Sequence, residues 1–128
     1  MGCLEVGIPD LHDGTITGLR LIEPTSLRVD VADWRGNRYA ITLTGLQRLK
    51  CLDFREGNII LDVDVYRGVL PPESALREVL NRRNNETSEH MKNLSRSIEV
   101  GDLTLLNITP SFGCEAIAIC SDIYIEKA

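Results

Sequence analysis

Apolar and polar residues alternate along several short segments of this chain, a pattern typical of β-strands that bury one face. The clearest segment is 59–66, where aliphatic residues at the odd-numbered positions alternate with Asp62 and Asp64. The alternation recurs at 27–31 and 39–44. Because successive side chains of a strand point to opposite faces, these segments predict a sheet with one dry face and one solvated, acidic face.

The first half of the chain predicts an antiparallel meander. Strands are expected at about 15–22, 27–32 and 38–44, and the connections between them are short and rich in turn residues. Gly18 lies where the apolar phase of the first strand slips, which predicts a β-bulge. Residues 45–57 fit either one helical turn or a packed irregular connection, and the pattern favours neither.

Helical patterns follow in the second half. Pro71, Pro72 and Glu73 predict a helix start, because proline is tolerated in the first turn and an acidic side chain suits the positive end of the helix dipole. The next segment, about 86–97, fits two interpretations equally. It is either a second helix capped by Asn85, with an apolar stripe, or a mobile loop.

The end of the chain returns to strands, and the whole predicts an α+β fold. Residues 103–108 are apolar on both faces, as in an internal strand, and 114–126 carry isoleucines of one strand parity. We expect a single domain over 1–128, with 82–101 as a candidate mobile insertion. Its antiparallel sheet should be curved or partly closed, with five to seven strands and one or two helices inserted before the last two strands.

Composition narrows the classes of function. Hydrophobic residues make up 43% and charged residues 26%, which is ordinary for a soluble globular protein. The formal net charge of −5 argues against nucleic acid as a ligand, which requires clustered Lys and Arg, and is compatible with a basic protein partner. No apolar run reaches the roughly 20 residues that cross a bilayer, and no secretory signal is recognisable, so a cytoplasmic location without membrane association is expected.

The cysteines do not predict a metal site. Cys3, Cys51, Cys114 and Cys120 form no Cys-x-x-Cys pair and have no histidine at ligand spacing. In a cytoplasmic protein they are expected to be reduced thiols that fill the core. No cofactor-binding motif is present either, so no cofactor is expected.

The most suggestive local motif joins His12 and Asp13. An adjacent His and Asp can ligate a metal, as in His-Asp phosphohydrolases. Such sites need three or four converging ligands, and the only other histidine in the sequence is His90. The competing interpretation is a turn into the first strand, in which Asp13 bonds to local backbone N–H groups.

Two further groups of residues are candidates for a partner-binding surface. Asp62 and Asp64, joined by Asp30 if its strand is adjacent, could share a cation or divide acid and base roles, although alternating aspartates also simply keep a half-exposed sheet soluble. Trp34, beside Arg35 in a predicted turn, is either a binding anchor or a side chain that closes the sheet. These five residues are the candidates for partner contact, and no nucleophile motif accompanies them.

Three motifs carry a resemblance to a family. They are Leu-His-Asp-Gly-Thr-Ile-Thr-Gly at 11–18, Arg-Glu-Gly-Asn-Ile-Ile-Leu-Asp at 55–62 and Ser-Phe-Gly-Cys-Glu at 111–115. The chain resembles small bacterial β-rich proteins with a Leu-His-Asp first strand, some of which look like immunity proteins of polymorphic toxin systems. The resemblance implies neutralisation of a toxin by surface binding, without chemistry.

The sequence therefore favours a non-catalytic, immunity-like module that binds a protein through an acidic sheet face or loops. The first alternative is a small metal-dependent hydrolase that uses His12 and Asp13 with Asp62 and Asp64. A second alternative is a partly closed barrel that holds a small apolar ligand in a pocket between sheet and helix. A homodimer through an open sheet edge is compatible with all three.

Overall fold

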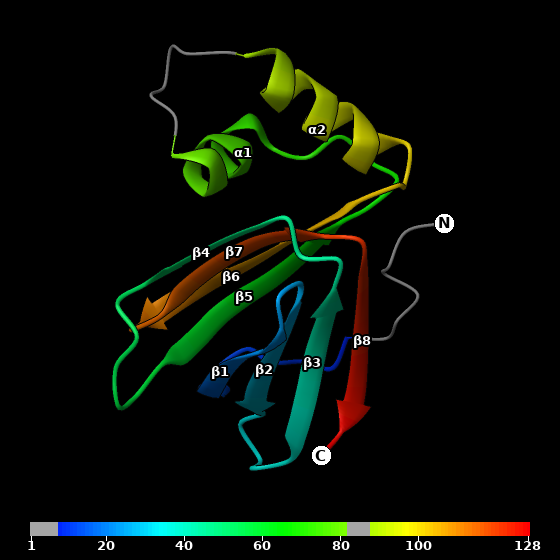
Figure 1. The fold of residues 1–128 in the computed structure, drawn as a ribbon. Coiled ribbons are helices and arrows are strands. Elements are labelled where there is room, and N and C mark those ends of the chain that lie inside the picture. The colour runs from blue at the N-terminus through cyan, green and yellow to red at the C-terminus, as the bar shows by residue number, and fades with distance from the viewer. Residues whose placement is uncertain (1–7, 82–87) are drawn as a thin grey trace.

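The computed structural model describes residues 8–81 and 88–128, which form one antiparallel sheet and two helices (Figure 1). The strands are β1 (Thr15–Glu23), β2 (Ser26–Ala32), β3 (Arg38–Thr44), β4 (Arg48–Leu52), β5 (Ile59–Tyr66), β6 (Thr104–Phe112), β7 (Glu115–Cys120) and β8 (Asp122–Lys127). The helices are α1 (Glu73–Leu80) and α2 (Glu89–Glu99). The predicted α+β class and the antiparallel pairing are confirmed.

The predicted number of strands is wrong, because the sheet has eight. Its order is β4-β7-β6-β5-β1-β2-β3-β8. One extra strand is β4, which lies inside the segment predicted to be a helical turn or an irregular connection. It is only five residues long, too short for its alternation to stand out. The other arises because the final segment is two strands, broken at Ser121, so the helices precede the last three strands.

The sheet divides into two halves that face each other. β4, β7, β6 and β5 form the middle layer of the molecule, and β1, β2, β3 and β8 form a second layer that crosses it (Figure 1). The chain passes between layers at two adjacent bends, from β3 to β4 and from β7 to β8. Backbone bonds hold these bends together, since Ser121 N–H donates to Thr44 O at 2.9 Å and Gln47 N–H donates to Ile119 O at 2.8 Å.

Two hydrophobic clusters fill the spaces between the layers. The inner core, between the two half-sheets, includes Val29, Ile41, Ile60, Leu106, Ile108 and Ile123. The helix-side core, between the helices and the middle layer, includes Leu76, Met91, Leu94, Ile98, Leu105, Ile117 and Ile119. The helices cover the face of the middle layer that points away from the inner core (Figure 1). β6 is therefore buried on both faces, as its sequence predicts.

The bend at Ser121 separates isoleucines that the sequence placed on one face. Ile117 and Ile119 pack against the helices, whereas Ile123 and Ile125 pack into the inner core. The four isoleucines share one strand parity in the sequence, but they belong to two strands. The two pairs pack into different cores, because the chain changes layers between the strands.

The predicted facing of β5 is correct for only part of the strand. Val65 is buried in the inner core and Val63 packs against it, as expected. Register shifts on both sides of Ile60 turn that residue into the core, where it is 1% exposed, and leave Leu61 39% exposed. Ile59 is also exposed. Bulges break strict alternation, so the odd-numbered positions do not share one face. The bulge predicted near Gly18 is confirmed by a register shift between Ile16 and Gly18.

Both helices end in recognisable caps. Pro72 occupies the N-cap of α1, and Asn81 closes that helix in a left-handed conformation. α2 begins at Ser88, whose hydroxyl accepts the Met91 N–H at 3.1 Å. The predicted cap, Asn85, lies outside the described residues, as does the 82–87 part of the candidate insertion. The rest of that insertion contains a packed helix. Among the described residues, neither helix is long and apolar enough to cross a membrane.

A buried asparagine joins the segments that meet at one corner of the sheet. Asn58 is 3% exposed, and its Oδ1 accepts the N–H groups of Arg55 at 2.7 Å and Cys114 at 3.0 Å. Its Nδ2 donates to Arg55 O at 2.7 Å and to Ile16 O at 3.3 Å. Gly113 has φ 85°, and a Cβ there would lie 2.6 Å from Asn58 Oδ1, so only glycine fits beside this amide.

Replacing this asparagine should destabilise the protein. Asn58→Ala leaves buried backbone donors and acceptors without hydrogen-bond partners. The free energy of unfolding, measured by chemical denaturation, should therefore fall by about 2–4 kcal/mol. Asn107→Ala is the matched control, because the buried Oδ1 of Asn107 has no hydrogen-bond partner within the described chain. That control should lose less than about 1 kcal/mol. Equal losses for the two variants would contradict a special role for Asn58.

Candidate functional site

A groove runs between β5 and the segment that precedes β1. We call it the acidic groove, and its volume is about 400 Å³. It is lined by Ile8, Pro9, Asp10, Leu11, His12 and the strand residues Leu61, Asp62, Val63, Asp64, Val65 and Tyr66. The structure thus brings Asp62 and Asp64 together with His12, as the sequence-based hydrolase hypothesis required, and adds Asp10, which the sequence did not single out.

The wall opposite β5 is held by one buried side chain and a tight turn. Leu11 is 3% exposed and belongs to the inner core. Gly14 N–H donates to Leu11 O at 2.8 Å, and Asp13 N–H donates to Ile60 O at 2.9 Å. The turn interpretation of this segment is confirmed, although the side chain that bonds to a backbone N–H belongs to Asp10, which accepts from His12 at 3.1 Å.

No neighbour among the described residues neutralises the two aspartates on β5. Asp62 and Asp64 are exposed, and as alternate residues of a strand their Cα atoms lie about 6.5–7 Å apart. Neither has an ion pair or a side-chain hydrogen bond within residues 8–81 and 88–128. Several other surface carboxylates do have cationic partners. Arg28 lies 2.8 Å from Asp30, Arg55 lies 2.8 Å from Asp53, and Arg67 lies 2.9 Å from Asp122.

Tyr66 is one of the residues that line the groove. Its ring packs against the helix-side core, and burial together with the nearby Asp64 carboxylate raises the pKa of its hydroxyl. The hydroxyl therefore keeps its proton at neutral pH and remains a hydrogen-bond donor. The groove combines carboxylate acceptors, a phenol donor and an imidazole with aliphatic walls.

The groove does not present a recognisable metal centre. His12 Nδ1 lies 3.3 Å from Asp13 Oδ2, and both side chains are more than half exposed. In the described part of the chain, no three His, Cys, Asp or Glu residues converge in a way that could hold a metal ion. Asp13 is not among the residues that line the groove. The residues of the hydrolase hypothesis are neighbours along one surface, without forming a ligand set.

The remaining candidates for partner contact lie elsewhere. Asp30 is on β2, which β1 separates from β5 in the sheet, so it does not join Asp62 and Asp64. Trp34 is 61% exposed in the turn after β2, which excludes the interpretation that it closes the sheet. The Arg35 guanidinium lies 4.7 Å from the centroid of its ring, a cation–π contact. Trp34 and Arg35 form a second exposed feature, whereas Asp30 is half-buried and paired with Arg28.

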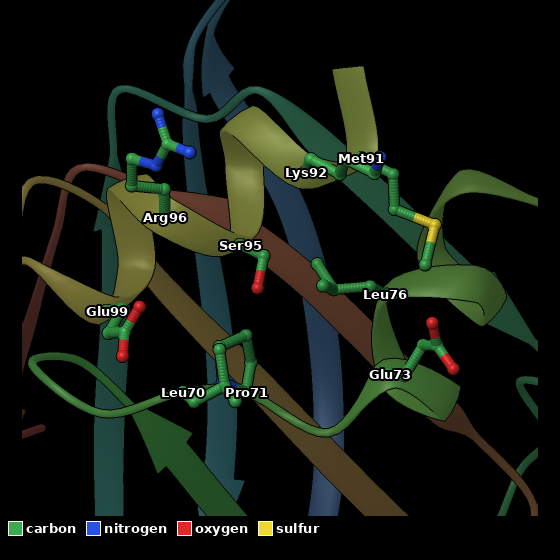
Figure 2. Close-up of a pocket in the computed structure, with 9 residues that line it drawn as sticks. All are labelled: Leu70, Pro71, Glu73, Leu76, Met91, Lys92, Ser95, Arg96 and Glu99. Atoms are coloured by element: carbon green, nitrogen blue, oxygen red, sulfur yellow. The ribbon is translucent and has the colours of Figure 1, made fainter. Parts of the chain in front are cut away.

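A second hollow lies between the two helices (Figure 2). Its volume is also about 400 Å³, and it is lined by Leu70, Pro71, Glu73, Leu76, Met91, Lys92, Ser95, Arg96 and Glu99. Leu76 and Ser95 point into it, and the Met91 thioether reaches toward α1 (Figure 2). The second alternative drawn from the sequence was a pocket between sheet and helix, whereas this hollow lies between the two helices. Leu70, which lines this hollow just before α1, is 64% exposed in the structure.

The titration of Tyr66 reports the negative potential of the acidic groove without any ligand. Asp64→Asn should lower the pKa of Tyr66, because the substitution removes a neighbouring negative charge that disfavours the tyrosinate. The measurement is an ultraviolet absorbance titration in a Tyr39→Phe/Tyr124→Phe background, so that Tyr66 alone contributes. Asp30→Asn is the control and should leave the pKa of Tyr66 unchanged. An unchanged pKa in Asp64→Asn would contradict the charge coupling.

Comparison with known proteins adds no relative. The chain matches no protein-family model, no curated protein and no solved structure. The argument for function therefore depends on the geometry and charge of the surfaces described above.

Proposed function

We propose that this chain is a non-catalytic protein-binding module that holds a basic segment of a partner in the acidic groove. The observation that carries the proposal is the pair of aspartates on β5, which line one groove and lack a cationic partner within the described chain. A Lys or Arg side chain from another protein would supply the missing charge. Opposite charges across an interface also speed encounter and fix its register.

The chemistry of the groove favours binding over catalysis. Its polar side chains can accept hydrogen bonds from an ammonium or guanidinium group, while Leu61 and the aliphatic walls can cover the methylene stem of such a side chain. Among the described lining residues there is no Ser, Thr, Cys or Lys that His12 could activate as a nucleophile. Trp34 and Arg35 offer a second contact for a large partner, since exposed Trp and Arg are common anchors of interfaces.

An immunity-like role fits this mode of binding. Neutralising a toxin requires only that a surface be covered, so an exposed acidic groove suits a basic target. This part of the proposal rests on the sequence resemblance. The alternative of a metal-dependent hydrolase has less support, because no ligand set converges among the described residues.

The proposal is tested with a labelled oligo-lysine peptide, a simple probe for a basic segment. The wild-type chain should bind it with an affinity that falls as salt rises. Asp62→Asn/Asp64→Asn should weaken binding about tenfold, which corresponds to about 1.4 kcal/mol. Fluorescence anisotropy measures both effects.

The matched control removes the same charge elsewhere. Asp102→Asn/Glu126→Gln also eliminates two exposed carboxylates, neither of which lines the groove. This control variant should retain most of the affinity for the peptide, because a peptide bound in the groove depends on the groove's own carboxylates and not on the net charge of the protein. Equal weakening in both variants, or no binding by the wild type, would count against the acidic groove as the site.

A further inference from the structure

Two cysteines far apart in sequence lie in direct contact. The Sγ atoms of Cys51 and Cys114 are 3.2 Å apart, although 63 positions separate the residues in the chain. Cys51 lies on β4, and Cys114 immediately precedes β7, the strand with which β4 pairs. Neither is in a disulfide. A disulfide bond is about 2.05 Å long, so the sulfur atoms need to approach by only about 1 Å.

We propose that Cys51 and Cys114 form a reversible disulfide bond when the protein meets a peroxide, and that this bond clamps β4 onto the sheet. The Cys51 thiolate attacks one oxygen of hydrogen peroxide, the O–O bond breaks, and after proton transfer Cys51 is a sulfenic acid and one water has left. The Cys114 sulfur then attacks the Cys51 sulfur. The S–O bond breaks, and the Cys114 proton leaves with the hydroxide as a second water.

The environments of the two thiols fit these different roles. Cys51 is half-buried on an edge strand, where a small oxidant can reach it. Cys114 is 1% exposed, and burial, with the neighbouring Cys51, raises its pKa to about 12. Cys114 therefore stays a thiol at neutral pH and is a poor first target. Because its sulfur is in contact with that of Cys51, Cys114 can still react in the second step. There its proximity to the sulfenic acid compensates for its small fraction of thiolate.

The bond would act on the least supported part of the sheet. β4 is an edge strand whose only sheet neighbour is β7 among the described strands. Cross-linking it closes a long loop, from Cys51 to Cys114, and restricts the unfolded chain. For a domain of this size we expect a rise in the thermal midpoint on the order of 5–10 °C. A thiol reductant should reverse this rise.

The experiment uses the full chain in a Cys3→Ser background, because Cys3 lies outside the described residues. Treatment with a slight excess of hydrogen peroxide should reduce the titratable thiols of the denatured protein from three to one. The intact mass should fall by about two mass units, as expected for loss of two hydrogens. Peptide mapping without reductant should recover one cross-link, between Cys51 and Cys114, with Cys120 still a thiol.

Cys51→Ser and Cys114→Ser are the matched controls, since each removes one partner of the bond. Neither should show a loss of mass or an upward shift of the midpoint after peroxide. The proposal is overturned if the wild-type pair keeps both thiols, if Cys51 only gains oxygen, or if the cross-link joins two molecules. A bond that forms but lowers the midpoint would also overturn it, because such a bond does not fit the native sheet.

Discussion

The side-chain amide of Asn58 is the interaction on which the rest of the structure depends. It binds the β4–β5 connection through Arg55, β1 through Ile16, and the β6–β7 turn through Cys114. At this corner the two half-sheets diverge, so some backbone groups have no strand partner, and a buried amide satisfies them instead. The same amide accepts the Cys114 N–H, so it helps to hold Cys114 where its sulfur meets Cys51. Two residues after Asn58, Ile60 exchanges backbone bonds with Asp13 and Gly14, at the end of the segment that forms one wall of the acidic groove.

The second constraint is that the chain changes layers at two bends that touch. β3 continues into β4 and β7 into β8, so two pairs of strands cross the corner of the molecule together. This arrangement lets eight strands enclose the inner core while the outer face of the middle layer stays free for the helices. It also leaves β4 and β8 as edges. α1 gives β4 a contact beyond its ladder, through the ion pair of Lys50 with Glu78.

The sequence predicted local features well and long-range ones poorly. Most strand positions, the bulge at Gly18 and the start of α1 depend on neighbouring residues and were recognisable, whereas β4 was missed and the α2 segment fitted a loop equally well. The facing of Ile59 and Leu61 was wrong, since a bulge is set by pairing with β6. Asp62 and Asp64 were identified because they follow the bulge in regular alternation. Asp10 and the contact between Cys51 and Cys114 were missed, because tertiary folding alone brings these distant segments together.

Asp62 and Asp64 on β5 have no cationic partner among the described residues, and a basic segment of another protein is the partner that we propose for them. The protein has 14 Lys and Arg residues, and it uses several of them to neutralise surface carboxylates such as Asp30, Asp53 and Asp122. Asp10 adds a third carboxylate to the same groove, and no Lys or Arg is among the described residues that line it. In this proposal a basic segment pairs with carboxylates that only the folded chain brings together, so it binds the folded state and not the unfolded one. Binding and folding stability are therefore coupled, and an occupied groove should also tighten the contact between β5 and the segment before β1.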